Sequence, residues 1–436
     1  MTKVSFISLG CSKNLVDTEV MLYNLYQAGF EIVPEPEHAE IIIINTCGFI
    51  ESAKQEAIDN ILDAAELKEW GKAKHIIATG CLVERYREQV MEELPEIDAL
   101  VGVGSLEDIA EACQAVLRGE KYTSFRDKEK SKLGGGRILT TAPHTAYIKI
   151  AEGCDNRCTY CAIPLIRGGF RSRCIEDIVH EARELEAEGV REINLIAQDT
   201  TRYGLDIYGK YSLARLVRAI CEETDIPWIR LLYCYPDKIT DELIDELRDN
   251  ERLVKYMDIP IQHISDTVLQ GMNRHGGAEL IRATVSKLRE RVPGITLRTT
   301  AMVGFPGESE ENFLETVEFV ERVGFIDAHV FAYSKRRGTP AAMYDGQIAE
   351  DEKKRRSHRL IEVKNRVRER VLSSLVEAGE PLMCILEGYD GKYYSAHSDE
   401  FAEVKVMAEP GREGEYVRAM PVSQSGGIIY ADIIHK

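Results

Sequence analysis

The sequence lacks the features of a membrane protein and of a general nucleic-acid binder. No apolar run approaches the ~18 residues that a membrane-spanning helix needs, and the longest, residues 41–44, suits a buried strand. Positive charge is also scarce, because 55 Lys and Arg stand against 73 Asp and Glu, a net charge of −18. Charge-driven nucleic-acid binding needs the opposite balance. We therefore expect a cytoplasmic protein that does not bind a membrane. If it has a macromolecular partner, we expect that partner to be basic.

Dense cysteine pairing is absent as well. The eleven cysteines are an odd number spread over 436 residues, whereas disulfide scaffolds are short and rich in cysteine. Clustered, unpaired cysteines indicate metal or redox chemistry in a reducing compartment. The length suits about three domains, and the sequence contains no repeat of short period and no low-complexity segment.

An alternation of strand and helix patterns predicts two α/β domains followed by an all-β module. In residues 1–118, short β-branched runs alternate with helical patterns, which is typical of a doubly wound parallel sheet. Residues 119–139 are polar and glycine-rich and suit a linker. Six further strand–helix units in residues 140–370 favour an incomplete TIM-like barrel, and residues 372–436 suggest a small all-β barrel. The predicted strands of the two α/β domains are 4–8, 41–44, 75–78, 100–103, 147–151, 193–197, 229–232, 257–259, 296–303 and 329–332.

The strongest chemical motif is a Cys-x3-Cys-x2-Cys run directly after the first strand of the second α/β domain. Its members are Cys154, Cys158 and Cys161. Three thiolates on one loop can hold three irons of a 4Fe–4S cluster and leave the fourth iron open. A structural zinc site is the alternative, but it needs four ligands, usually in Cys-x2-Cys pairs. Cys174, thirteen residues further on, is the candidate for a closing fourth ligand.

A second set of three cysteines repeats at one structural offset. Cys11, Cys47 and Cys81 are spaced by 36 and 34 residues, and each follows the end of a predicted strand by about three residues. The carboxyl ends of parallel strands share one edge of a sheet, so these thiols should converge there. Three unrelated buried cysteines in tight turns are the other interpretation. Beside the first motif, we expect a second cluster site.

At the first motif, the sequence resembles the radical S-adenosylmethionine enzymes. The resemblance implies that the open iron chelates S-adenosylmethionine and that the reduced cluster cleaves it to a 5′-deoxyadenosyl radical, which removes hydrogen from a C–H bond. The protein's part is to position the cofactor and exclude water. Gln198, Gln262, Gly304 and Gly307 lie at predicted strand ends, where such a barrel builds its site. We expect these four to contact S-adenosylmethionine.

The two cysteine sets and the terminal β-module together resemble the methylthiotransferases, over essentially the whole chain. This resemblance implies an auxiliary 4Fe–4S cluster on Cys11, Cys47 and Cys81, a radical barrel and a carboxyl-terminal TRAM domain. It also implies conversion of C–H to C–S–CH3 with two S-adenosylmethionine molecules. An electron donor such as flavodoxin or ferredoxin is the expected partner for reduction.

Three segments are similar to the branch of that family that modifies an aspartate in small-subunit ribosomal protein twelve, free or in the ribosome. They are residues 8–19 (SLGCSKNLVDTE), 47–51 (CGFIE) and 167–173 (RGGFRSR). The tRNA-modifying branch usually has an aromatic-Gly-Cys-Gln-x-Asn version of the first segment. We therefore expect the ribosomal-protein activity. A tRNA adenosine methylthiotransferase is the alternative, and a non-catalytic iron–sulfur carrier is the third interpretation.

Charge in the terminal module is consistent with that choice. Residues 377–436 contain eleven acidic and five basic residues, a net charge of −6. An acidic module suits a basic protein partner, whereas an RNA-binding module should be basic, so we do not expect tRNA as a partner. An ordinary acidic surface is the simpler explanation. Asp399, Glu400 and Glu403 form the densest acidic group, which we expect in an outward turn that meets the partner.

Overall fold

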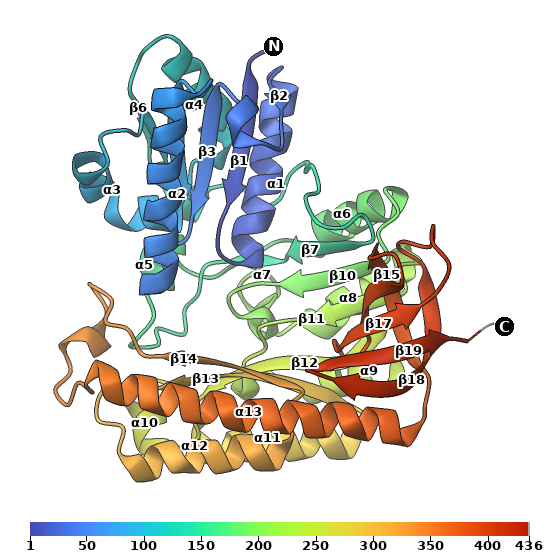
Figure 1. Ribbon diagram of the computed structural model, residues 1–436. Coiled ribbons are helices and arrows are strands. Elements are labelled where there is room, and N and C mark those ends of the chain that lie inside the picture. The colour runs from blue at the N-terminus through green and yellow to red at the C-terminus, as the bar shows by residue number, and fades with distance from the viewer. Residues whose placement is uncertain (435–436) are drawn as a thin grey trace.

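The computed structural model describes residues 1–434 and shows three packed parts (Figure 1). The amino-terminal part is a parallel sheet of order β2-β1-β3-β4-β5-β6. Its strands are β1 Lys3–Ser8, β2 Glu31–Ile32, β3 Ile41–Thr46, β4 His75–Gly80, β5 Ala99–Val101 and β6 Tyr122–Ser124. Helices cover both faces: α1 Ser12–Gln27 and α4 Ile109–Leu117 on one, α2 Glu51–Trp70 and α3 Cys81–Glu93 on the other. The predicted doubly wound sheet is confirmed, because the isoleucines of β3 alternate between two buried faces.

The central part is a second parallel sheet of order β7-β10-β11-β12-β13-β14. Its edge strands β7 and β14 do not pair with each other in the part of the chain that the structure describes, so the predicted incomplete barrel is confirmed. The strands are β7 Thr145–Lys149, β10 Glu192–Ile196, β11 Trp228–Leu231, β12 Leu253–Gln262, β13 Thr296–Val303 and β14 Asp327–Ala332, with a small ribbon of β8 Ala151–Glu152 and β9 Arg171–Ser172. The helices are α5 Ile163–Arg167, α6 Ile175–Ala187, α7 Leu205–Tyr208, α8 Leu213–Glu223, α9 Asp241–Asp249, α10 Asp266–Gly271, α11 Gly277–Arg291 and α12 Glu310–Val323.

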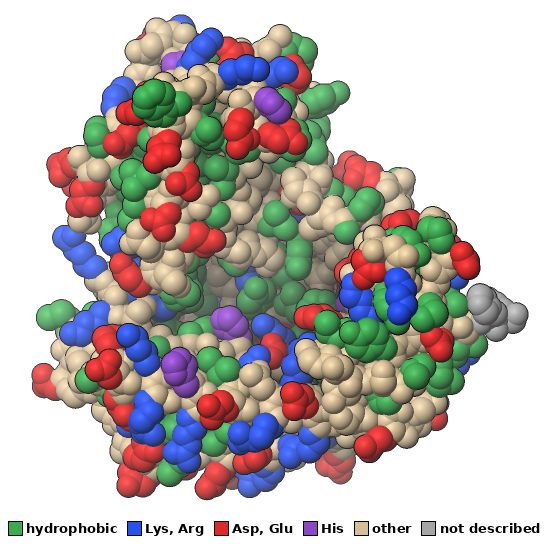
Figure 2. All heavy atoms as spheres, viewed as in Figure 1, with side chains coloured by type: hydrophobic (Ala, Val, Ile, Leu, Met, Phe, Trp, Pro, Cys, Tyr) green, Lys and Arg blue, Asp and Glu red, His purple; other side chains and the backbone are tan. Residues whose placement is uncertain are grey.

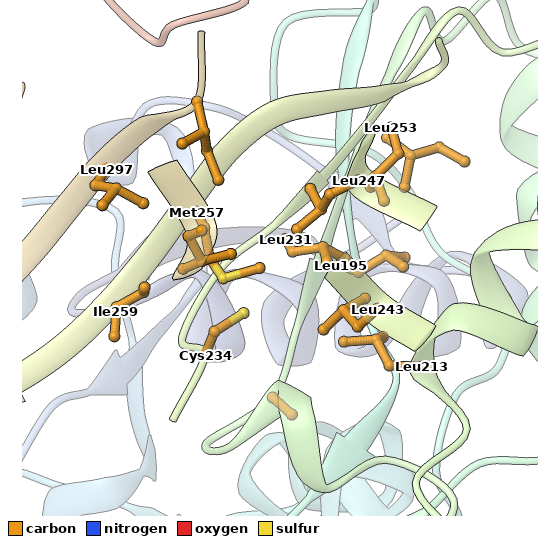
Figure 3. Close-up of a cluster of buried hydrophobic side chains, with 14 of the residues drawn as sticks. Leu195, Leu213, Leu231, Cys234, Leu243, Leu247, Leu253, Met257, Ile259 and Leu297 are labelled. Carbon is orange, nitrogen blue, oxygen red and sulfur yellow. The ribbon is translucent and has the colours of Figure 1, made fainter. Parts of the chain in front are cut away.

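Alternation along the barrel strands separates an apolar outer face from a polar inner one. In Figure 3, Leu195, Leu231 and Met257 from the strands pack with Leu243 and Leu247 of α9. The intervening residues, such as Lys149, Glu192, Asn194, Arg230 and Asp258, are buried and polar. Helices cover the outer face of this sheet, so its charged side chains lie on the concave inner face.

The carboxyl-terminal part is a closed five-stranded barrel of order β15-β16-β17-β19-β18, as predicted for a TRAM domain. Its strands are β15 Leu382–Tyr389, β16 Tyr393–Ser398, β17 Glu403–Met407, β18 Tyr416–Ser425 and β19 Ile428–Ile433. The long helix α13 Glu350–Ala378 packs along β14 and then reaches β18 (Figure 1).

Two expected domain limits differ from the observed elements. The boundary at 370–372 lies inside α13, because the buried positions Leu360, Val363, Val367 and Leu372 continue the helical spacing past it. The expected linker 119–139 contains β6, which pairs with β5 and completes the first sheet. Three residues with no apolar alternation carry too little signal to be recognised as a strand.

The acidic turn that we expected to face a partner packs against the barrel instead. The buried guanidinium of Arg230 donates to the carbonyl oxygens of Asp399 and Ser398 at 2.8 and 3.3 Å and to Glu192 at 2.9 Å. Burial raises the pKa of Asp399 to about 8, aided by the neighbouring Glu400. The expectation was wrong for Asp399 and Glu400, which are partly buried; Glu403 is exposed.

The same interface contains a histidine between two carboxylates. His397 places Nε2 2.8 Å from Glu192 of the central barrel and Nδ1 2.8 Å from Glu387 of its own domain. Burial alone lowers the pKa of His397, but the two hydrogen-bonded carboxylates raise it to about 9. A charged His397 therefore helps to hold the small barrel on the central one at neutral pH.

This contact predicts a loss of stability in mild alkali. The folded-state pKa of His397 lies above its ordinary value of 6.5, so its contribution is complete below that value and is lost as the pH rises through about 9. We expect the melting temperature of the wild type to fall more steeply between about pH 7 and pH 10 than that of His397→Gln, measured by scanning calorimetry. Parallel pH profiles would show that His397 carries no charge in this contact.

Candidate active site

The three amino-terminal cysteines lie together at the carboxyl edge of the first sheet. Cys11 is the N-cap of α1, Cys81 is the first residue of α3, and Cys47 follows β3. Gly10 has φ +94°, and a Cβ on it would lie 2.8 Å from the Cβ of Cys47. A Cβ on Gly48 would lie 2.9 Å from the backbone of Leu82, next to Cys81. Only glycines allow these loops to approach so closely, and this approach brings the thiols together.

The electrostatics of this set are those of crowded, buried thiols. Burial, together with the nearby Cys11 and Cys47, raises the pKa of Cys81 to about 12. Burial likewise raises the pKa of Cys47. Arg167 opposes this effect, with its guanidinium 3.6 Å from the sulfur of Cys81. The helix N-termini at Cys11 and Cys81 also favour thiolate.

The second set lies on the loop after β8, and neighbouring strand ends anchor that loop. Asn156, inside the cysteine motif, donates to Asp199 at 2.7 Å and accepts from Lys238 at 2.9 Å. Lys238 also lies 3.2 Å from Asp199. The backbone of Thr159 is tied to Met272. Side chains that follow β10 and β11 thus hold the motif over the mouth of the barrel.

Both sets fit iron–sulfur ligation better than a single metal ion. Burial raises the pKa of Cys154 to about 11 and that of Cys161 to about 12, and the neighbouring Cys158 contributes to both shifts. Bound metal would offset this cost, since its charge stabilises thiolates. Within residues 1–434, no three Cys, His, Asp or Glu side chains are close enough to share one ion. A 4Fe–4S cluster holds its thiolates further apart than one ion does, because each thiolate binds a different iron. The ligand roles of all six cysteines stay a prediction.

A buried network of charges joins the two sets across the domain boundary. Arg167, four residues after the start of α5, donates to Asn14 at 2.6 Å and Asp17 at 2.9 Å in α1, and to Glu152 at 2.9 Å in the barrel. Lys149 contacts the same two carboxylates, Asp17 and Glu152. All four charged side chains are at most 9 % exposed. The network holds the Cys81 sulfur beside the barrel's first loop.

A second contact across the boundary is made by Arg336, which follows β14. Its guanidinium lies 4.3 Å from the ring centroid of Phe49 and donates at 2.6 Å to the carbonyl of Tyr160, within the cysteine motif. In the sequence, the basic run of residues 335–337 favours a solvated loop, and this expectation is wrong for Arg336, which is buried. Roles for Lys149 and Lys238 were not expected, because neither lies in a motif. Arg167 lies in the segment 167–173 that resembles one branch of the family, but its contacts were not expected either.

The other predicted site residues lie at the strand ends where we expected them. Gln198 follows β10 and donates to Glu152 at 2.8 Å, and Gln262 ends β12 with φ +68°. Gly304 donates to Glu308 at 2.7 Å, and Gly307 to the carbonyl of Gly346 at 2.9 Å. Their contact with S-adenosylmethionine stays a prediction. Cys174 is exposed at the N-cap of α6, beside Tyr203.

The face of the molecule in Figure 2 is hollowed between the amino-terminal part above, the central barrel below and the small barrel at the right. The carboxyl edges of both parallel sheets meet at this junction, where the charge network lies. Ligands of α/β folds bind outside the carboxyl ends of strands. This junction is therefore the candidate active site.

Comparisons with known proteins agree with this arrangement. Two family models match: the one described as Uncharacterized protein family UPF0004 over residues 3–102, and the Radical SAM superfamily over residues 148–320. A protein of Clostridium tetani named Ribosomal protein uS12 methylthiotransferase RimO is 44% identical over 405 residues, 92% of this chain and 90% of that protein. A protein of the same name from Thermoanaerobacter sp. is 42% identical over 435 residues, 99% and 97% of the two chains.

The chain belongs to the ribosomal protein uS12 methylthiotransferase family. It is thus a radical S-adenosylmethionine methylthiotransferase, and membership of that superfamily implies a 4Fe–4S cluster and S-adenosylmethionine. The expected family and enzyme class are confirmed. None of the helices in the described part of the chain has both the length and the apolar character that a bilayer span requires.

Solved structures show the same fold at low identity. The radical S-adenosylmethionine methyltransferase TsrM from Kitasatospora setae has a TM-score of 0.58 at 16% identity, covering 79% of this chain and 77% of TsrM. The cobalamin-dependent radical enzyme OxsB has a TM-score of 0.51 at 13% identity, covering 82% of this chain and 56% of OxsB. Such likeness supports the fold and says nothing of the substrate.

Proposed function

We propose that the protein methylthiolates the β-carbon of an aspartyl residue in ribosomal protein uS12, using two 4Fe–4S clusters and two molecules of S-adenosylmethionine. Cys154, Cys158 and Cys161 would hold the radical cluster, and Cys11, Cys47 and Cys81 the auxiliary one. The observation that carries the proposal is the buried network of Arg167, which links Cys81 of one set to Glu152, two residues before Cys154 of the other. Insertion of sulfur at carbon requires the hydrogen-removing and sulfur-donating sites to face the same atom.

In this proposal the protein's own residues position and enclose the reactants. The radical cluster with S-adenosylmethionine supplies, when bound, a 5′-deoxyadenosyl radical that removes one hydrogen from the substrate. Asn156, Asp199 and Lys238 fix the loop of the radical cluster. Arg167 and Lys149 fix the auxiliary thiols relative to that loop. Gln198 and Gln262, at the ends of β10 and β12, are the expected contacts for the cofactor.

The choice of a protein substrate rests on the relatives and on charge. The relatives reported above are named for ribosomal protein uS12, and residues 8–19 resemble the ribosomal-protein branch. The terminal module carries a net charge of −6, which disfavours the tRNA backbone as a ligand. A tRNA adenosine substrate is the alternative that the experiment must separate.

Mass spectrometry of cells that lack the protein tests the substrate. We expect the methylthio mass increment to disappear from the uS12 peptide and to remain on tRNA. Complementation with the wild-type chain should restore the increment, and complementation with a variant lacking Cys11, Cys47 and Cys81 should not. Loss of the increment from tRNA, with uS12 unchanged, would refute the proposed substrate and support the tRNA alternative.

A further inference from the structure

Lys13 is a buried lysine whose ammonium contacts an aromatic ring. It lies in the first turn of α1, two residues after Cys11, and is 5 % exposed. Its Nζ lies 2.8 Å from the ring centroid of Tyr233, which follows β11 in the barrel. Lys13 thus crosses from the auxiliary thiols to the mouth of the barrel. A cation–π contact offsets only part of the cost of burying a lysine.

The acidic side chains of the surrounding elements are already paired with other cations. Asp17 of α1 contacts Lys149 and Arg167. Asp258 of β12 accepts from the backbone N–H of Tyr233 at 3.1 Å and from Arg298 at 3.1 Å. Within residues 1–434, no carboxylate lies within ion-pair distance of Lys13. The positive charge of Lys13 is therefore available to a bound anion.

The backbone at Tyr233 supports a functional role for this contact. Tyr233 adopts φ +61°, a conformation that is uncommon for a bulky side chain. Gln262, at the end of the neighbouring strand β12, has φ +68°. Two strained residues at adjoining strand ends of the candidate active site indicate that the fold holds these side chains in place for a purpose other than stability.

We propose that Lys13 binds the side-chain carboxylate of the substrate aspartate. This inference rests on the proposed function. The target carbon must face the barrel, where hydrogen is removed, and the auxiliary thiols, where sulfur is held; Lys13 spans these two places. The carbon that reacts is bonded to the carboxylate carbon, so an ion pair with Lys13 would position it directly. Lys13 would then be a substrate-binding residue that distinguishes an aspartate from its amide.

A double-mutant cycle tests the pair. Anaerobically reconstituted wild type and Lys13→Met are titrated with two fluorescent peptides of the uS12 target loop, one with Asp and one with Asn at the modified position. We expect Lys13→Met to weaken binding of the Asp peptide about 10- to 100-fold and to leave the Asn peptide nearly unchanged. Lys13→Arg should retain most of the preference for Asp, because it keeps the charge.

Controls separate this role from the alternatives. Lys74→Met changes an exposed lysine at the opposite edge of the same domain and should alter neither peptide's affinity. Equal weakening of both peptides by Lys13→Met would overturn the inference and leave Lys13 a structural residue. A raised KM for S-adenosylmethionine in 5′-deoxyadenosine formation without peptide would assign Lys13 to the cofactor carboxylate, and would also overturn it. If the wild type modifies tRNA and neither peptide, the proposed function fails instead.

Discussion

Replacing Cys154, Cys158 and Cys161 together with alanine is expected to abolish 5′-deoxyadenosine formation. If each set holds one 4Fe–4S cluster, the reconstituted wild type should contain roughly eight irons and this variant half of them. The loss of activity should be complete, because the loop after β8 would keep no thiolate, and the auxiliary set Cys11, Cys47 and Cys81 belongs to the amino-terminal domain. Iron content and anaerobic turnover of S-adenosylmethionine, measured on the same preparations, provide the readout.

A matched variant removes the amino-terminal set of cysteines instead. Replacing Cys11, Cys47 and Cys81 with alanine should also halve the iron, yet S-adenosylmethionine should still be cleaved, since the barrel loop is anchored by Asn156 and Lys238 within its own domain. No methylthio product should form. A wild type that holds only one cluster's worth of iron would refute the two-cluster proposal, whatever the variants do.

Arg167→Met is expected to uncouple the two halves of the site. The substitution leaves Asp17 and Glu152, both buried, with Lys149 as their shared cation. Removing one partner of a buried ion pair typically lowers the free energy of unfolding by about 3–5 kcal/mol. We expect methylthio product to fall by at least tenfold while iron content and 5′-deoxyadenosine formation persist. Hydrogen exchange should increase in α1 and in the loop between β8 and β9, where the lost contacts lie.

Arg173→Met is the matched control for that prediction. Arg173 lies in the same segment and is 5 % exposed, but its carboxylate partners Asp177 and Glu181 both belong to α6 of the barrel. Its loss should cost stability without separating the thiol sets. Both variants should therefore melt at lower temperature, and only Arg167→Met should change the ratio of product to 5′-deoxyadenosine. An unchanged ratio in Arg167→Met would refute its role in positioning the auxiliary site.

Much of the architecture could be predicted because its signals are local in the sequence. The β-branched runs at 41–44 and 75–78 predicted buried parallel strands, and the structure contains β3 and β4 there. Equal offsets of Cys11, Cys47 and Cys81 from three strand ends predicted that they would share one sheet edge. The short strands β2 and β6 could not be predicted, since two or three residues show no periodicity.

The sequence by itself determined the class of chemistry, because cysteine spacing within one loop and position after a strand are properties of a short segment. Tertiary structure alone decided which charges meet. Arg167 contacts Asp17 across 150 residues, Lys13 contacts Tyr233, and Asp399 turns toward Arg230 instead of toward solvent. No local pattern encodes such pairs, since a buried charge is placed by the partner that offsets its desolvation, and that partner comes from another domain.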